Sequence, residues 1–326
     1  MLISAYSYVS VNHIITSKHI LYLKNRSNYI EQNKVCSIFK NKDDNWTILT
    51  PIEQSIKNKI ETIGTPIKDW NLNINRGVLT GYNEAFIIDE NTKNRLIEED
   101  PKSAEIIRPI LRGKDIKKYK YVFAKLYLIS TFPSQKLDID KYPAIKKYLL
   151  SFGKEKLGQT GEEHIVNGLK IKARKKTNNK WFETQDSIAY WDDFYKQKIV
   201  YPCIMAQDPS FAYDNSKYFT IAPGNIISGE HLKYLCCLLN SELLYFALRK
   251  FYMGGGIEGE LKTNRLLILP VKKPSLEEEK LFENLYNEVT LPDKKQEKKI
   301  NDVIFSIYNI STEEILYVKQ NNKKGN

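Results

Sequence analysis

The chain has 326 residues, of which 42% are hydrophobic, so it is long enough to bury one or two cores without help from disulfides. Lysine and arginine outnumber aspartate and glutamate by 50 to 39, and the formal charge of +11 favours a polyanionic partner, with nucleic acid first. Four cysteines without metal spacing, no signal peptide and no apolar run of membrane length argue against a secreted, metal-binding or membrane protein, and we expect a soluble, cytoplasmic one with reduced thiols.

The first elements lie between residues 46 and 129. A polar helix is predicted at 51–63, where Gly64 and Pro66 end it. In NRGVLTGYNEAFIID (75–89), two apolar runs flank Gly81-Tyr82-Asn83, and this pattern is typical of a hairpin. A helix is predicted from Asp100-Pro101 to Arg108-Pro109, then a charged turn at 112–115 and a strand at 121–129.

The middle of the chain carries its most basic segment. A helix is predicted at 142–153, with Pro143 in its first turn. The segment HIVNGLKIKARKKTNNKWF (164–182) follows, and its surrounding glycines predict an irregular loop. It contains no acidic residue, whereas a solvated surface usually mixes both signs of charge. We therefore expect phosphate contacts from its cationic side chains: Lys170, Lys172, Arg174, Lys175, Lys176 and Lys180.

The last third turns from strands to helices. Strands are predicted at 198–205 and 218–228, the second with a turn at Pro223-Gly224. An apolar helical region spans 231–252, and Ser241 is placed to cap a second helix within it. Two Ser-x-x-Glu capping boxes, which begin at Ser275 and Ser311, each predict a helix. The fold class is α+β, with a mixed β-sheet followed by a helical C-terminal region.

Enzymatic motifs are weak in this sequence. Gly77 and Gly81 are not followed by the lysine of a phosphate-binding loop. Asp208-Pro209-Ser210-Phe211 resembles the Asp/Asn-Pro-Pro-aromatic tetrad that grips a flipped base, but its second proline is missing and no glycine-rich cofactor loop accompanies it. Glu278-Glu279-Lys280 and Glu297-Lys298-Lys299 have the spelling of nuclease motifs, but they lie on predicted solvent-facing helices. No histidine has metal-ligand spacing.

Five segments in order resemble one family. They are INRGVLTGYNEAFIID (74–89), IIRPILRGKDIKKY (106–119), KIVYP (198–202), YLCCLLNSELLYF (234–246) and GGGIEGELKTNRLLILPV (254–271). Together they resemble the carboxy-terminal specificity domain of TaqI-like and Eco57I-like adenine methyltransferases, which is found in type IIG restriction-modification enzymes and in phage-defence methyltransferases. The resemblance covers roughly residues 46–318 and includes INDVIFSIYNISTEEI (300–315), where Asn309 replaces the usual glycine and Asn301 precedes Asp302.

The resemblance implies a target recognition domain that clamps duplex DNA against a catalytic domain, reads an asymmetric sequence and presents one adenine for N6 methylation. The chain departs from the family because it lacks the Asn-Pro-Pro-Tyr tetrad and the glycine-rich cofactor loop. We expect residues 1–45 to be the end of a methyltransferase-like domain, 46–270 the recognition domain and 271–326 a helical C-terminal region, with no catalytic residue and no cofactor in this chain. S-adenosylmethionine, and Mg²⁺ if a nuclease is present, belong to the complete system. The expected partners are double-stranded DNA and a methyltransferase or nuclease encoded upstream, and no membrane.

Residue roles follow from the resemblance as groups. Besides the basic segment, the first signature, the second signature and the glycine-rich segment supply candidate DNA-binding residues, although Asp115 is also expected to pair with Arg112 and Asn83 to cap its own turn. The candidates are Arg76, Thr80, Tyr82, Asn83, Arg112, Lys114, Gly255, Lys262 and Asn264.

Two alternatives stay open. The chain is a self-sufficient methyltransferase that uses Asp208-Pro209-Ser210-Phe211, or it is a non-catalytic scaffold that docks on a partner through its helical tail.

Overall fold

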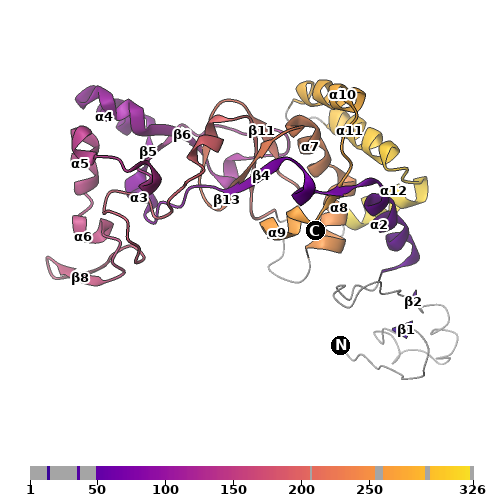
Figure 1. Cartoon of the computed structure of the whole chain (residues 1–326), viewed down its shortest axis with the longest axis horizontal. Coiled ribbons are helices and arrows are strands. Elements are labelled where there is room, and N and C mark those ends of the chain that lie inside the picture. Colours follow the sequence, from indigo (N-terminus) through magenta and orange to yellow (C-terminus); the bar gives the residue numbers. More distant parts are fainter. Residues whose placement is uncertain are drawn as a thin grey trace.

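A four-stranded sheet joins two lobes of the molecule (Figure 1). The structure is a computed structural model that describes residues 49–205, 208–253, 260–290 and 294–323, together with the backbone of two short paired strands, β1 (His13–Ile14) and β2 (Val35–Cys36). The expected methyltransferase remnant at 1–45 therefore lies almost wholly outside the described residues, and the Gly254-Gly255-Gly256 turn lies outside them altogether.

The joining sheet is antiparallel, in the order β11, β10, β13, β4. Its strands are β4 (Leu72–Arg76), β10 (Lys198–Pro202), β11 (Ala212–Asp214) and β13 (Gly224–Gly229). Successive residues of a strand point to opposite faces. Accordingly, Ile199 and Ile227 lie in the core of the second lobe, whereas Val200 and Ile226 lie in the core of the first. One face of the sheet therefore belongs to the core of the first lobe and the other face to the core of the second.

The first lobe, at the left of Figure 1, contains a mixed sheet in the order β12, β6, β7, β5. β5 (Ile87–Asp89) and β6 (Ile107–Leu111) pair antiparallel with β7 (Leu126–Ile129), and β12 (Phe219–Thr220) pairs parallel with β6. The lobe is completed by helices and one hairpin: α3 (Asn83–Phe86), α4 (Glu90–Glu99), α5 (Pro143–Leu150), α6 (Lys154–Leu157), β8 (Glu163–Val166) and β9 (Leu169–Lys172).

The second lobe, at the right of Figure 1, is mostly helical. Its centre is formed by α7 (Leu232–Leu239) and α8 (Glu242–Ala247), which a π-helical turn continues to Tyr252. The outer helices are α2 (Pro51–Ile63), α9 (Thr263–Leu267), α10 (Leu276–Asn287), α11 (Lys294–Ile307) and α12 (Thr312–Lys323). The short strands β3 (Thr65–Pro66) and β14 (Pro270–Val271) pair, so α2 shares one core with the C-terminal helices. The division at residue 270 stays a prediction.

Several sequence predictions are confirmed. The fold is α+β with a helical C-terminal region. The helix predicted at 51–63 has these bounds, and Pro143 begins α5. Ser241 accepts a hydrogen bond from the backbone of Leu244, and the capping boxes at Ser275 and Ser311 are both formed. Among the described helices, none is both long and apolar enough to cross a membrane.

The hairpin predicted around Gly81 is wrong. Val78 pairs with Ile221 instead, the residues after Tyr82 form the short helix α3, and β5 pairs with β7. Both apolar runs find partners far along the chain because each contributes buried side chains to the core of the first lobe. The helix predicted from Asp100-Pro101 to Arg108-Pro109 is shorter than expected. A 3₁₀ helix spans Pro101–Ile106, and the next residues, Ile107–Leu111 with Pro109, form the strand β6.

The loop predicted for the basic segment is wrong for its first half, because β8 and β9 form a regular antiparallel hairpin, whereas residues 173–182 form no helix or strand. Its two-residue turn is Asn167-Gly168, with φ angles of 51° and 76°. Both residue types tolerate positive φ, and Asn-Gly between alternating side chains is the strongest short-range signal for a hairpin. The glycines of the neighbouring sequence obscured this signal.

Candidate nucleic-acid interface

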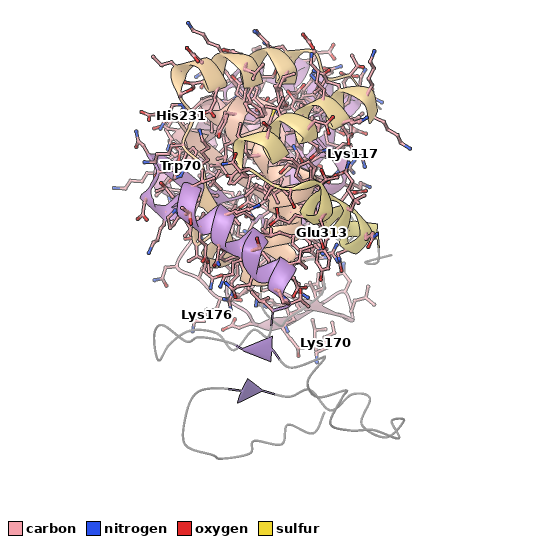
Figure 2. The ribbon with its side chains drawn as sticks, turned by 90° about the vertical axis from the view of Figure 1, so that its right-hand side faces the viewer. Trp70, Lys117, Lys170, Lys176, His231 and Glu313 are labelled. Atoms are coloured by element: carbon pink, nitrogen blue, oxygen red, sulfur yellow. The ribbon has the colours of Figure 1, made fainter. Side chains whose placement is uncertain are left out.

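The β8–β9 hairpin projects from the lower end of the first lobe (Figure 1). Val166 pairs with Leu169 next to the turn, and Glu163 pairs with Lys172 at the far end. Five lysines on and after the hairpin are exposed: Lys170, Lys172, Lys175, Lys176 and Lys180. Figure 2 shows Lys170 and Lys176 on the lower side of the molecule, away from Trp70 and His231 of the second lobe. One ion pair is formed within the hairpin, between Lys170 Nζ and Glu163 Oε2 at 2.6 Å.

Arg174 was predicted to face phosphates together with these lysines, and this is wrong. Its side chain is only 5% exposed. Its Nε donates to the carbonyl of Leu157 at 2.9 Å, Nη1 donates to the carbonyls of Thr80 and Glu183 at 2.9 and 2.8 Å, and Nη2 donates to that of Trp181 at 2.6 Å. The guanidinium therefore ties the base of the hairpin to three other backbone segments.

A second buried polar side chain, that of Gln159, supports the same region. Gln159 is 4% exposed, and its Nε2 donates to the carbonyls of Lys180 and Glu183 at 3.1 and 3.0 Å, while its Oε1 accepts from Thr177 Oγ1 at 2.7 Å. These bonds hold residues 177–183 against the hairpin base. The lysines thus stand on an ordered backbone, and less conformational entropy is lost when they meet a ligand.

Residues Thr80 to Asn83 lie against this base. Thr80, one of the DNA-binding candidates, is fully buried. Its Oγ1 donates to Asn83 Oδ1 at 2.7 Å and accepts from the backbone of Tyr82. Asn83 is exposed and begins α3, and Tyr82 is half-buried edge-on to Phe152, with Lys156 Nζ 4.5 Å from its ring centroid. The amide oxygen of Asn83 thus accepts from Thr80, and no side chain among the described residues caps the start of α3.

A second group of candidates meets at one end of the joining sheet, where β4 ends at Arg76, β10 ends at Pro202 and β13 begins. The backbone of Leu261 donates to the carbonyl of Cys203 at 2.7 Å, which brings Lys262 and Asn264 to this end. Gly113 packs closely on Pro202, which brings the turn at 112–115 there as well. We call this region the strand-end surface. It comprises Arg76, Arg112, Lys114, Lys262 and Asn264.

Arg112 is held by Asp115 within the strand-end surface. Its Nε and Nη2 donate to the two carboxylate oxygens at 2.9 and 2.8 Å, so the expected local pair is confirmed. The hydrogen bonds that Arg112 donates to Asp115 raise the pKa of Arg112. Burial alone would raise the pKa of Asp115, but the bonds from Arg112 keep it below its ordinary value. Arg76, Lys114 and Asn264 are exposed around this fixed pair, whereas Gly255 lies outside the described residues.

The aromatic side chain of the methyltransferase-like tetrad belongs to the core of the second lobe. Phe211 is fully buried, stacks on Tyr201 with ring centroids 5.1 Å apart, and is bonded through its backbone to Asn240. It therefore has no free face for a flipped base. Asp208 and Pro209 line a cavity of about 510 Å³ with Glu242, Tyr245 and Glu297.

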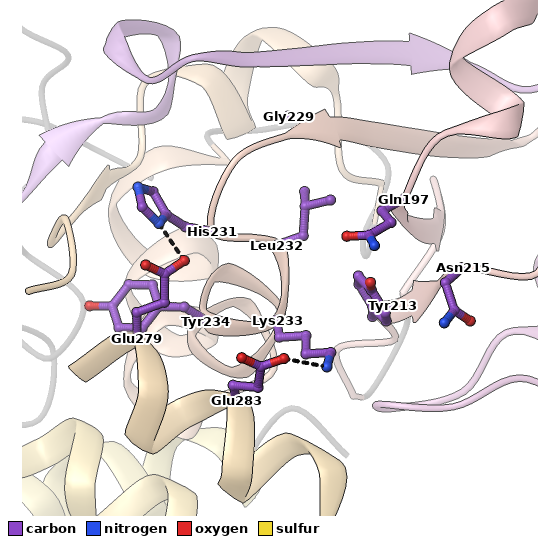
Figure 3. A pocket seen from close by; sticks show the side chains of 10 residues that line it. All are labelled: Gln197, Tyr213, Asn215, Gly229, His231, Leu232, Lys233, Tyr234, Glu279 and Glu283. Carbon is purple, nitrogen blue, oxygen red and sulfur yellow. Dashed lines mark hydrogen bonds and ion pairs between the residues drawn. The ribbon is translucent and has the colours of Figure 1, made fainter. Parts of the chain in front are cut away.

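A smaller hollow of about 310 Å³ lies between α7 and α10 (Figure 3). A hydrogen bond between His231 Nδ1 and Glu279 and an ion pair between Lys233 Nζ and Glu283 cross it, each at 2.7 Å. They join the two helices, and no predicted DNA-binding residue lines this hollow.

Comparisons with known proteins agree with the sequence resemblance. The pattern of the TaqI-like C-terminal specificity domain matches residues 108–271. The fold is similar to that of the type IIL restriction-modification enzyme MmeI, solved in complex with DNA, at 14% identity and a TM-score of 0.51 over 80% of this chain and 36% of that one. The type IIG restriction endonuclease BpuSI matches at 14% identity and a TM-score of 0.45, over 83% and 32%. The chain thus spans about a third of the length of these enzymes. No curated protein matches it.

Proposed function

Because the chain belongs to the family of TaqI-like C-terminal specificity domains, we propose that it binds duplex DNA and recognises its sequence on behalf of a restriction-modification or phage-defence N6-adenine methyltransferase. One observation carries the proposal: five exposed lysines lie on a projecting hairpin and on the segment that follows it. Lysines held in this way bind phosphates by charge and fix the position of a protein on the duplex without reading its sequence.

The strand-end surface is the proposed place for reading bases. Arginine, asparagine and lysine donate to base edges in the major groove. Arg76 and Asn264 are exposed there, and neither side chain has a hydrogen bond or an ion pair within the described parts of the chain. Arg112 is held in its orientation by Asp115, which leaves its outer edge as the part available to a ligand.

Catalysis in this proposal belongs to a methyltransferase, with or without a nuclease, that acts together with this chain and uses S-adenosylmethionine. A self-sufficient methyltransferase is disfavoured because Phe211 of the candidate tetrad is buried. The direct check is binding of S-adenosylmethionine to the 326-residue chain by calorimetry, where we expect no heat of binding; micromolar affinity would restore the methyltransferase alternative.

The proposal predicts salt-dependent binding to duplex DNA. If all five lysines contact phosphates, a plot of log K against log[salt] has a slope of about −4.5. Fluorescence anisotropy with labelled duplexes between low and physiological salt measures this slope. No binding at low salt, or binding that is indifferent to salt, would support the scaffold alternative instead.

Paired variants sharpen this test. Lys172→Gln with Lys175→Gln should weaken binding to all duplexes and make the slope shallower by about 2. The same change at Lys294 and Lys295, two exposed lysines of α11 in the second lobe, is the matched control and should leave the slope unchanged.

A further inference from the structure

The tip of the β8–β9 hairpin is unusually apolar for such a basic element. Ile165 is 81% exposed and Leu169 is 71% exposed; among the described large apolar side chains, Ile165 is the most exposed. Ile165 lies directly opposite Lys170, and Leu169 lies opposite Val166. Opposed residues share a face of the ribbon and neighbouring pairs alternate. The two aliphatic side chains therefore lie on opposite faces, one on each side of the Asn167-Gly168 turn.

The stem of the hairpin, which we define as β8, β9 and the residues up to Lys176, is positively charged, and this charge indicates which ligand Ile165 and Leu169 contact. Lys170 and Lys172 lie on β9, and Lys175 and Lys176 follow it directly, whereas Glu163 is the one acidic residue of the two strands. A polyanion with apolar groups at the bottom of a groove fits both features. In duplex DNA the phosphates line the rims of the major groove, and thymine methyl groups lie on its floor.

The dimensions favour the major groove over the minor groove. A four-residue strand is about 13 Å long, which exceeds the depth of about 8.5 Å of the major groove. The two strands of a ribbon lie about 4.8 Å apart, and with side chains the ribbon suits a groove about 12 Å wide rather than one about 6 Å wide.

The base of the hairpin is rigid enough to aim its tip. The backbone of Ala173 donates to the carbonyl of Glu162, that of Arg174 to Gly158 and that of Gly161 to Arg174, each at 2.9 Å. Together with the buried guanidinium of Arg174, these bonds fix both ends of the ribbon to the first lobe.

On these grounds, and resting on the proposed function of duplex binding, we propose that the β8–β9 hairpin enters the major groove of DNA. Ile165 and Leu169 contact base edges, with thymine methyl groups as their partners, and the lysines of the stem contact the phosphates on either side. Ile165 and Leu169 are then specificity-determining residues.

The test begins with selection of bound duplexes from a random-sequence pool by the 326-residue chain, followed by affinity measurements on the selected duplex. The double variant Ile165→Ala, Leu169→Ala should bind this duplex on the order of tenfold more weakly, because apolar contact area is lost. Its salt slope should stay unchanged, since no phosphate contact is removed. Replacement of thymine by uracil in the selected duplex should lower the affinity of the original chain for that duplex. It should have no further effect on the affinity of the variant.

A matched control is Leu276→Ala, because Leu276 is 78% exposed but lies on α10 of the second lobe. Thermal melting checks that each variant is folded. Unchanged affinity and an unchanged selected sequence in the double variant would overturn the groove assignment while duplex binding itself stands. If the variant instead lost binding to anionic phospholipid vesicles and kept DNA binding, the tip would belong to a membrane contact and the inference would be wrong. Absence of any DNA binding by the original chain would remove the proposed function as well.

Discussion

Arg174 lies within a run of lysines, yet its side chain points into the protein and is bonded to four backbone carbonyls. Burial lowers its pKa to about 10, so the guanidinium remains charged at neutral pH. Arginine suits this position because its donors are spread over three nitrogens of a planar guanidinium, whereas the three donors of lysine all lie on one nitrogen.

Replacement of Arg174 by methionine should therefore destabilise the protein strongly. The change leaves buried carbonyls without donors, and we expect a loss of about 3–5 kcal/mol in the free energy of unfolding. Urea unfolding followed by circular dichroism measures this loss. The neighbouring substitution Lys175→Met, at an exposed position, should change stability by less than about 0.5 kcal/mol; equal stabilities of the two variants would contradict the structural role of Arg174.

At the scale of elements, two buried carboxylates join α2 to the end of the chain. Glu53 accepts from Tyr317 of α12 and pairs with Lys250, each at 2.8 Å. Glu314 of α12 accepts from Ser55 and Lys59 of α2, at 2.7 and 2.6 Å. Burial alone would raise both pKa values, but the hydrogen bonds from the lysines and from neighbouring backbone and side-chain groups keep both below the ordinary value.

This contact should weaken in acid. Because each folded-state pKa is lower than the unfolded one, the stabilisation is complete above about pH 4.3, the ordinary pKa of glutamate, and is lost as pH falls through the folded values. We expect Tm to fall steeply below that pH. The double variant Glu53→Gln, Glu314→Gln should have a lower Tm at pH 7, and its Tm should fall less as the pH is lowered (a flatter acid limb of the curve of Tm against pH). Calorimetry from pH 3 to pH 7 tests this, with Glu98→Gln on the exposed side of α4 as control. An acid limb as steep in the double variant as in the original chain would refute the assignment.

At the scale of the whole molecule, the joining sheet couples the two lobes because its faces belong to different cores. Ile226 and Ile227 are adjacent in β13 and both are fully buried, yet each packs into a different lobe. A destabilising substitution on either face disturbs the same strands, so the two lobes should unfold together.

Variants that keep a single tryptophan can report each lobe separately, Trp70 for the second lobe and Trp181 for the first. We expect coincident unfolding transitions from both reporters. Ile226→Ala and Ile227→Ala should each lower both transitions, by about 2–5 kcal/mol. If Ile226→Ala shifted the Trp181 transition alone, the lobes would be independent.

The sequence by itself determined the features that depend on neighbouring residues. The helix at 51–63 and the caps at Ser241, Ser275 and Ser311 are all set by hydrogen bonds between residues three or four apart, so their pattern is legible in the chain. The ordered signatures also indicated the family. The turn at Asn167-Gly168 also depends on neighbouring residues, but it was not predicted from the sequence because the glycines around it obscured the alternation of its flanking strands.

Only the tertiary structure decided which cations of the basic segment are exposed. Arg174 and Lys175 are adjacent in the same basic run, yet carbonyls from residues 80 to 183 converge on the first, while the second remains in solvent. The pairing of Val78 with Ile221, and the meeting of Arg76 with residues 260–264 at one end of the sheet, likewise join segments more than a hundred residues apart. Such contacts depend on which buried surfaces fit one another, and no local pattern encodes that fit.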